Sequence, residues 1–437
     1  MRPLELVLAV AEVTAWVVAA AGLRHATLAA GAALAVAALQ AAVEGARWQL
    51  VPAYGCAAAL IAAVALGARD AGPRAFAAVG VVALCGAVAL PLAVPVFRLP
   101  TPSGPHAIGS STRWWSDAAR ADGFTGAARR ELMVQLWYPA ADRPEAPRVP
   151  YVPDASVFGP LLDLLGAPHF LLDHLALVRT HAVDGAPPAP GRFPVVVFLS
   201  GRGGFRQSNT ALVEELVSHG YLVAALDLPS ASCGVVFPDG RRVAMDPRLY
   251  DPARPGHPAF LDEAVPLLAA DVAFALDRLD ALDRDDPEHL LTGQLDGSRA
   301  GIVGVSLGGI VAAQACADDA RLRACIVLDA FAPADVVQRG LHQPALWLSR
   351  DADTMRAEGW HEADVAETQA SMRAVTAGLG DAGELLLLPG AYHLDFTDAP
   401  RYSPLLRWFG LTGPIPPPQA HALVSTSVRG WLDRWLR

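Results

Sequence analysis

The stretch that decides the fold is Gly304-Val305-Ser306-Leu307-Gly308-Gly309. Residues 299–303 before it form an apolar, β-branched run typical of a buried strand, and residues 310–315 after it have the small apolar composition of a helix. A serine between glycines on a sharp strand-to-helix turn is a nucleophile elbow, because glycines permit the strained backbone that exposes the hydroxyl. A glycine-rich turn with an incidental serine is the alternative, but the flanking pattern favours the elbow. We therefore predict that Ser306 is a nucleophile.

A serine hydroxyl is a poor nucleophile near neutral pH, so it requires a histidine to accept its proton and an acid to orient that histidine. The histidines that follow the serine are His342, His361, His393 and His421. His393 comes directly after the strand-like run 384–390, whereas His361 lies in a charged, helix-like segment and His421 in a C-terminal amphipathic helix. We predict His393 as the general base and interpret His361 and His421 as solvated surface residues.

Two acids compete for the third position, because each closes a strand-like run between the serine and the histidine. Asp329 ends the run 324–328, and Asp351 follows the run 344–350. Apolar residues enclose Asp329, whereas Asp351 lies in a charged segment typical of a solvated turn. The charged segment contains Arg350, Asp351, Asp353 and Arg356. Strand position leaves both acids open, but a triad acid is normally buried against its histidine, which favours Asp329.

An acyl-transfer site also requires N–H donors for the charge that develops on the carbonyl oxygen. One donor usually belongs to the residue after the nucleophile, and the other to a loop after an earlier strand. The apolar run 193–199 leads directly into the glycine-rich turn 200–205, so we predict the backbone amides of Arg202 and Leu307 as the pair. The turn lacks the lysine-containing phosphate-loop spacing and the complete G-x-G-x-x-G pattern, which argues against a phosphate-binding loop.

On these residues the chain resembles the platelet-activating factor acetylhydrolase group of α/β-hydrolases, close to bacterial dienelactone-hydrolase-like and polyester-hydrolase-like esterases. The matched segments are 104–109, 134–140, 193–205, 239–240, 304–309, 328–331, 343–344 and 393–398. The resemblance implies an α/β-hydrolase fold with a mostly parallel central sheet, a Ser-Asp-His triad and ester hydrolysis. In the common hydrolase plan the acid follows a later strand, which corresponds to Asp351. In this group it follows the strand next after the nucleophile, which corresponds to Asp329.

The chain departs from the pattern of this group in the oxyanion loop. Ser200 stands where the group usually has histidine, and Arg202 replaces an apolar residue. The backbone donors do not depend on these side chains, but we expect a more polar pocket mouth. The Arg202 side chain either contacts an anionic headgroup or points into water, which is the commoner environment of a loop arginine.

The first 98 residues belong to another physical class. Their apolar stretches of near-spanning length are 4–23, 26–43, 50–68 and 75–97. Repeated stretches with charged breaks favour membrane-spanning helices over a signal peptide. We therefore predict a transmembrane region of about four helices over residues 1–98 and a catalytic domain over residues 99–437. Glu12 falls inside the first stretch, where no partner appears at matching depth, and we interpret it as a helix-packed side chain.

An even number of spans places the N-terminus and the hydrolase on the same side of the membrane. The arginines near the spans are Arg2, Arg47, Arg98 and Arg113 on that side and Arg24, Arg69 and Arg74 on the other. This small excess favours a cytoplasmic hydrolase. The segment 153–181 is apolar at helical spacing, and we expect it to pack within the fold, to cap the pocket or to contact lipid.

Composition argues against several other classes. A net charge of -10 and the lack of a basic tract argue against nucleic-acid binding. The five cysteines show neither a disulfide framework nor zinc spacing, so we predict no cofactor and no metal. The expected partners are a membrane and a lipid or small ester, with a short-acyl phospholipid favoured. A general carboxylesterase or polyester hydrolase is the alternative enzyme, and a catalytically idle fold that acts as a membrane interaction module is the alternative without activity.

Overall fold

The computed structural model describes residues 1–67, 73–250 and 257–437, and the chain divides into two compact units. We call them the helical unit and the hydrolase unit. The helical unit contains Met1–Arg98, Phe170–Val178 and Arg401–Leu405. The hydrolase unit contains Leu99–His169, Arg179–Pro400 and Leu406–Arg437. Two short segments from the later part of the chain therefore pack with the N-terminal helices, which their sequence did not indicate.

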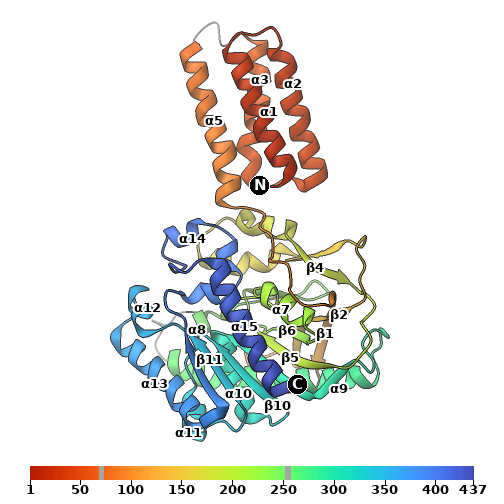
Figure 1. The fold of residues 1–437 in the computed structure, drawn as a ribbon, viewed down its shortest axis with the longest axis vertical. Coiled ribbons are helices and arrows are strands. Elements are labelled where there is room, and N and C mark those ends of the chain that lie inside the picture. Colours follow the sequence, from red (N-terminus) through yellow and green to blue (C-terminus); the bar gives the residue numbers. More distant parts are fainter. Residues whose placement is uncertain (68–72, 251–256) are drawn as a thin grey trace. The chain divides into compact units, whose positions relative to one another are not determined.

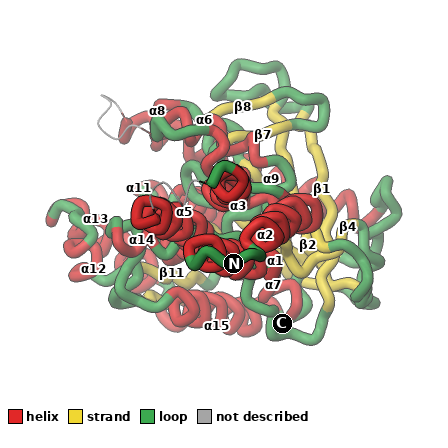
Figure 2. The backbone as a smooth tube through the Cα atoms, turned by 90° about the horizontal axis from the view of Figure 1, so that it is seen from above, coloured by secondary structure: helices red, strands yellow, loops and turns green. Residues whose placement is uncertain are grey.

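Within its described residues the helical unit has four helical segments that are long and apolar enough to cross a membrane: Pro3–Ala20, Ala26–Gly45, Trp48–Ala65 and Arg74–Ala93 (Figure 2). The helices are α1 (Pro3–Ala20), α2 (Ala26–Gln40), α3 (Val51–Ala65) and α5 (Pro73–Ala93). A π-helical turn, Ala41–Gly45, extends α2, and a 3-10 turn, Trp48–Leu50, precedes α3. The fourth apolar stretch was expected to reach Phe97, but α5 ends at Ala93 because Pro95 disfavours a helical conformation before it. The predicted end of the third stretch, Ala68, lies outside the described residues.

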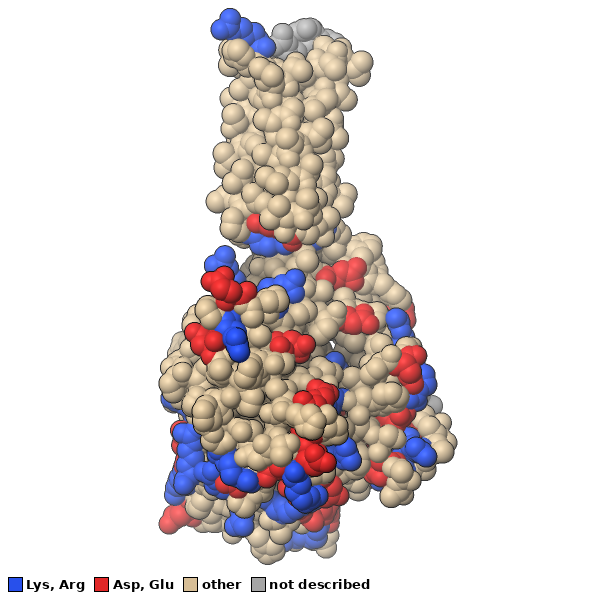
Figure 3. Space-filling model, turned by 90° about the vertical axis from the view of Figure 1, so that its right-hand side faces the viewer, with Lys and Arg blue, Asp and Glu red and all other residues tan. Residues whose placement is uncertain are grey.

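The helical unit places large apolar side chains outside and small ones inside. Val10, Leu28 and Val82 are 58%, 73% and 73% exposed, whereas most residues buried between the helices are alanines. A Cβ atom on Gly80 would lie 2.5 Å from the Trp16 ring, so only glycine lets α5 approach α1 this closely. The face in Figure 3 shows no Lys, Arg, Asp or Glu between the two ends of these helices. Such a surface is suited to lipid rather than water.

The hydrolase unit is built on a sheet of ten strands in its described part, in the order β12-β11-β10-β9-β5-β6-β2-β1-β4-β3 (Figure 1). β6, β5, β9, β10, β11 and β12 are parallel neighbours, whereas β2 is antiparallel to both β1 and β6. The mostly parallel sheet confirms the predicted fold class, with β1 and β2 as an antiparallel pair before the parallel strands. The strands are β1 (Ala107–Asp117), β2 (Arg130–Ala140), β3 (Arg148–Pro150), β4 (Arg179–Asp184), β5 (Phe193–Leu199), β6 (Leu222–Asp227), β9 (Leu295–Val305), β10 (Leu322–Leu328), β11 (Ala345–Ser349) and β12 (Gly383–Leu387). A separate hairpin pairs β7 (Gly234–Val236) with β8 (Arg242–Ala244).

Helices cover both faces of this sheet. The side chains of α9, α10 and α13 form one apolar core against it, and those of α7 and α15 form the other. Every residue of β5 is buried, which explains its continuous apolar sequence. The helices are α6 (Gly159–Leu164), α7 (Thr210–Ser218), α8 (Pro247–Tyr250), α9 (His257–Arg284), α10 (Leu307–Asp318), α11 (Ala334–Arg339), α12 (Ala352–Ala357), α13 (Glu362–Gly378), α14 (Leu405–Trp408) and α15 (Pro417–Leu436).

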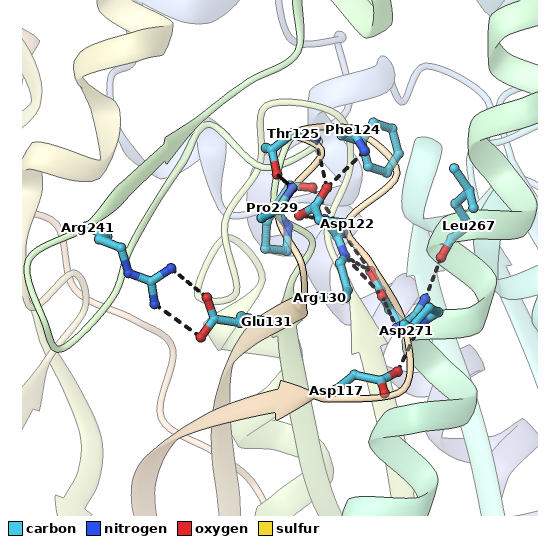
Figure 4. Close-up of polar contacts among 12 residues, drawn as sticks. Asp117, Asp122, Phe124, Thr125, Arg130, Glu131, Pro229, Arg241, Leu267 and Asp271 are labelled. Carbon is cyan, nitrogen blue, oxygen red and sulfur yellow. Dashed lines mark hydrogen bonds and ion pairs between the residues drawn. The ribbon is translucent and has the colours of Figure 1, made fainter.

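A buried ion-pair network ties β2 to α9 (Figure 4). The Arg130 side chain is 2% exposed, and its guanidinium lies 2.9 Å from Asp122 Oδ2 and 2.7 Å from Asp271 Oδ2. It also donates to the carbonyl of Pro229, which follows β6, at 3.1 Å. Burial by itself would raise the pKa of Asp122, but the Arg130 charge and two backbone N–H groups outweigh burial and lower it. This network fixes the start of β2 from three directions.

Candidate active site

Ser306 sits on a strained turn between β9 and α10. Its φ and ψ are 54° and −123°, a conformation that costs an ordinary residue energy and turns the side chain outward. A Cβ atom on Gly304 would lie 2.1 Å from the carbonyl oxygen of Gly308, and one on Gly308 would lie 2.4 Å from that of Ser200. Both glycines are therefore required by close backbone contacts, as the elbow interpretation expects.

His393 begins a 3-10 turn, His393–Phe396, beyond β12. Its Nε2 lies 3.0 Å from Ser306 Oγ, and its Nδ1 lies 2.5 Å from Asp329 Oδ2. An ionised carboxylate only accepts hydrogen bonds, so Nδ1 carries the proton and Nε2 is free to accept the serine hydroxyl. The structure thus brings Ser306, His393 and Asp329 into one hydrogen-bonded chain. Their catalytic roles remain predictions.

Asp329 follows β10 and is held by hydrogen bonds on both carboxylate oxygens. Besides His393, Oδ1 accepts from the Ser349 hydroxyl at 2.8 Å and from the backbone N–H of Arg350 at 3.2 Å. Burial alone would raise the pKa of Asp329, but hydrogen bonding and charge from His393 and the charge of Arg350 outweigh it, so the pKa lies well below its usual range. Asp329 is therefore an ionised acceptor at neutral pH, as a histidine-orienting acid requires.

Asp351, the competing acid, caps the N-terminus of a helix instead. It stands before the first residue of α12, and its carboxylate accepts the Thr354 N–H at 2.7 Å. The expectation of a solvated charged turn holds for Asp353, whose side chain is 92% exposed, but is wrong for Arg350, which is 1% exposed. Arg350 is buried because Asp329 and Glu358 compensate its charge. Sequence reasoning missed this role, since no local pattern distinguishes Arg350 from Arg356.

The predicted oxyanion loop runs against the nucleophile. A Cβ atom on Gly201 would lie 3.0 Å from Ser306 Cβ and 3.6 Å from Ser306 Oγ. Leu307 is the first residue of α10, where helical geometry leaves the N–H without an intrahelical acceptor. The side chain of Arg202 was expected to meet water or a headgroup, but its guanidinium donates to the Leu249 carbonyl at 2.6 Å. The Arg202 and Leu307 amides stay the predicted donor pair.

Known proteins resemble both the fold and the sequence. The model of the family "Platelet-activating factor acetylhydrolase, isoform II" matches residues 93–242, and that of the "Alpha/beta hydrolase family" matches residues 196–437. The platelet-activating factor acetylhydrolase of Gallus gallus is 23% identical over 375 residues, which cover 78% of this chain and 84% of that protein. The enzyme of the same name from Cavia porcellus is 26% identical over 290 residues, 60% of this chain and 64% of that protein.

A solved structure extends the likeness. The ferulic acid esterase of Streptomyces cinnamoneus superposes with a TM-score of 0.61 at 31% sequence identity, over 78% of this chain and 94% of that one. The alpha/beta hydrolase model covers more than half of the chain, and it includes the elbow, both strand ends that carry acids, and the histidine loop. This chain therefore belongs to the alpha/beta hydrolase family and is, within it, similar to the platelet-activating factor acetylhydrolases.

Proposed function

We propose that Ser306, His393 and Asp329 hydrolyse carboxylic esters through an acyl-enzyme. The observation that carries this proposal is the hydrogen-bonded chain from Asp329 through His393 to a serine on a strained elbow. The reaction class is that of a serine ester hydrolase, in keeping with the family. Each partner of the triad is held from a different strand end, so the site depends on the whole parallel sheet.

The first half of the reaction forms the ester of Ser306. Its Oγ attacks the substrate carbonyl carbon while His393 Nε2 takes the hydroxyl proton, and Asp329 stabilises the imidazolium that results. The oxyanion of the tetrahedral intermediate receives hydrogen bonds from the Leu307 and Arg202 amides. When the intermediate collapses, the bond to the alcohol oxygen breaks, and His393 gives its proton to the departing alcohol.

The second half reverses these roles with water. His393 takes a proton from a water molecule, whose oxygen attacks the acyl carbonyl. The second tetrahedral intermediate expels Ser306 Oγ, which recovers its proton from His393. The products are the free carboxylic acid and the unchanged enzyme.

A short-acyl phospholipid or another small lipid ester is the substrate class that we favour. Two observations support it: the relatives from Gallus gallus and Cavia porcellus are named for platelet-activating factor, and the chain carries apolar helices of spanning length. The likeness to a ferulic acid esterase supports the second candidate, a general carboxylesterase or polyester hydrolase that accepts esters of other acids. A panel of water-soluble esters that vary in acyl length and include an aromatic acid distinguishes the two.

For the location, the proposal is a multi-pass membrane protein in which residues 1–98 anchor a catalytic domain of residues 99–437. The length and hydropathy of the four helices in the described residues support the anchor. An even number of spans keeps the N-terminus and the hydrolase on one side, and the arginine excess favours the cytoplasmic side.

Replacing the nucleophile tests the proposed function. We expect Ser306→Ala to lower kcat on a short-chain ester by about 10³-fold or more, because only the attacking oxygen is lost. A fluorophosphonate probe should label the wild type and leave this variant unlabelled. Ser298→Ala is the matched control, since its hydroxyl lies on the same strand and, within the described part of the chain, donates only to the nearby Asp296 Oδ1, at 2.5 Å. Substantial activity in Ser306→Ala rejects the nucleophile, and an unlabelled wild type favours the idle module.

A further inference from the structure

The end of β11 carries a buried cation beside the triad. Arg350 follows β11 directly, and its Nε lies 3.0 Å from Asp329 Oδ1 and 2.9 Å from Asp329 Oδ2. Its backbone N–H donates to the same carboxylate at 3.2 Å. The main chain and the side chain of Arg350 therefore both donate hydrogen bonds to the Asp329 carboxylate.

The other end of the guanidinium reaches the histidine loop. Arg350 Nη1 forms an ion pair with Glu358 Oε2, and Glu358 Oε1 accepts the backbone N–H of His393 at 3.2 Å. The Trp360 ring packs on the guanidinium, with 4.5 Å between the Arg350 Cζ atom and the ring centroid. Asp329, Arg350, Glu358 and His393 thus form a closed ring of polar contacts, which we call the clamp ring. It joins the loops that follow β10, β11 and β12.

We propose that Arg350 is a positioning residue for the triad: it fixes the Asp329 carboxylate directly and the His393 main chain through Glu358. This inference rests on the proposed function. Its effect is to keep His393 Nε2 within hydrogen-bonding distance of Ser306 Oγ, because the imidazole is then located both by its ring nitrogen and by its backbone.

The chemistry of the clamp ring requires an arginine. A guanidinium presents several N–H groups in a rigid plane, so Nε can face Asp329 while Nη1 faces Glu358. A lysine at this position retains the charge but offers a single nitrogen. Removing the cation leaves two carboxylates close together without compensation, in a region where Asp329 is fully buried.

The position of this cation also explains why the triad acid follows β10 and not β11. The common hydrolase plan places the triad acid after the strand that corresponds to β11. Here the first residue after β11 is Arg350, whereas the acid follows the neighbouring strand β10. An acid on β10 and a cation at the adjacent strand end are complementary, and Asp351 is left to cap α12.

The test compares variants of the full chain in detergent on a water-soluble short-chain ester. Prolonged fluorophosphonate labelling gives the concentration of competent sites, so that kcat refers to folded enzyme. We expect Arg350→Met to lower kcat on the order of 10–100-fold with KM within about twofold, because geometry and not substrate binding is lost. Arg350→Lys should recover part of this loss. Glu358→Gln should lower kcat less, since its amide oxygen still accepts the His393 N–H.

Arg356→Met is the matched control. Arg356 lies on α12, its side chain is 45% exposed, and it pairs with Asp353 and Glu362. We expect wild-type kcat from this variant. An Arg350→Met enzyme with the kcat of the control, or with a change in KM alone, overturns the inference.

Two further measurements keep the test decisive. If Arg350→Met does not fold, Arg350→Lys and Glu358→Gln carry the test, and wild-type kcat in both overturns the inference. Ser306→Ala is assayed in parallel. Retained activity in Ser306→Ala overturns the proposed function itself, whereas its loss together with unaffected Arg350 variants overturns only the positioning role.

Discussion

Glu12 in the helical unit and Asp329 in the hydrolase unit are both fully buried carboxyl groups, yet their surroundings are opposite. Neither oxygen of Glu12 has a hydrogen-bond partner among the described residues. Both oxygens of Asp329 are occupied, by His393, Ser349 and Arg350. Around Glu12 the helical unit is held by apolar packing, although near the start of α1 the buried Glu5 carboxylate pairs with Arg47 at 2.9 Å. In the hydrolase unit, buried charges are paired and define the geometry of the site.

The largest effect should come from changing the partnered carboxylate. We expect Asp329→Asn to reduce kcat by about 10⁴-fold, because the amide neither selects the correct histidine tautomer nor stabilises the imidazolium. Asp351→Asn should retain most activity, since an asparagine caps α12 about as well as an aspartate. Steady-state kinetics of both variants checks the contrast. Greater damage from Asp351→Asn would restore the common hydrolase plan.

The second effect should appear in stability. Asp271 is a fully buried partner of Arg130, and its loss leaves that guanidinium only partly compensated. We expect Asp271→Asn to lower the free energy of unfolding by about 3–5 kcal/mol. Asp277→Asn, on the same helix with a side chain 66% exposed, should change it by less than about 0.5 kcal/mol. Denaturant unfolding of the chain that begins at Leu99 measures both, and equal effects would contradict the comparison.

The same network predicts an acid limit for the fold. The pKa of Asp122 is lowered in the folded state, so its ion pair with Arg130 contributes stability above the pKa of the unfolded chain. That contribution is lost as the pH falls through the folded-state pKa. In Asp122→Asn the free energy of unfolding should therefore fall less steeply than in the wild type as the pH drops below about 4.

The third effect separates the two units physically. A chain that begins at Leu99 should be soluble and should hydrolyse a water-soluble short-chain ester, because the triad and both predicted oxyanion donors lie after that point. On an ester embedded in vesicles we expect a rate about 10–100-fold lower than that of the full chain, since the anchor supplies local concentration. Assays of both chains on both substrates decide the matter. An equal loss of activity on both substrates would mean that the helices stabilise the hydrolase unit. No loss of activity on either substrate would mean that the helices determine only where the protein is located.

The smallest effect should come from the partnerless carboxyl group. Glu12→Gln keeps the size of the side chain, and neither Glu12 oxygen has a hydrogen bond to lose among the described residues. We therefore expect the free energy of unfolding to stay within about 1 kcal/mol of the wild type and the activity to be unchanged. Thermal unfolding of the full chain in detergent, together with the vesicle assay, measures this. A large loss in either would give Glu12 a function that its surroundings do not reveal.

The sequence by itself determined the elements whose signals are local. The glycines around Ser306, the turn that follows β5 and the histidine after β12 each depend on a few consecutive residues, because a strained turn or a strand end imposes its own residue types. The apolar helices of residues 1–98 were equally predictable from the sequence, since few structures other than membrane-spanning helices require apolar runs of this length. The burial of Asp329 was predictable from its apolar neighbours, and this burial together with the family resemblance favoured Asp329 as the predicted triad acid.

The tertiary structure decided which distant residues meet. Arg350 and Arg356 stand in one charged run, yet the first is buried between Asp329 and Glu358 and the second is exposed, because only the fold sets the direction in which the chain leaves β11. The grouping of Phe170–Val178 and Arg401–Leu405 with the N-terminal helices was likewise invisible in the sequence. Local patterns specify local backbone, whereas a contact such as that between Arg350 and Asp329 depends on how β10 and β11 align, and that alignment is a property of the folded sheet.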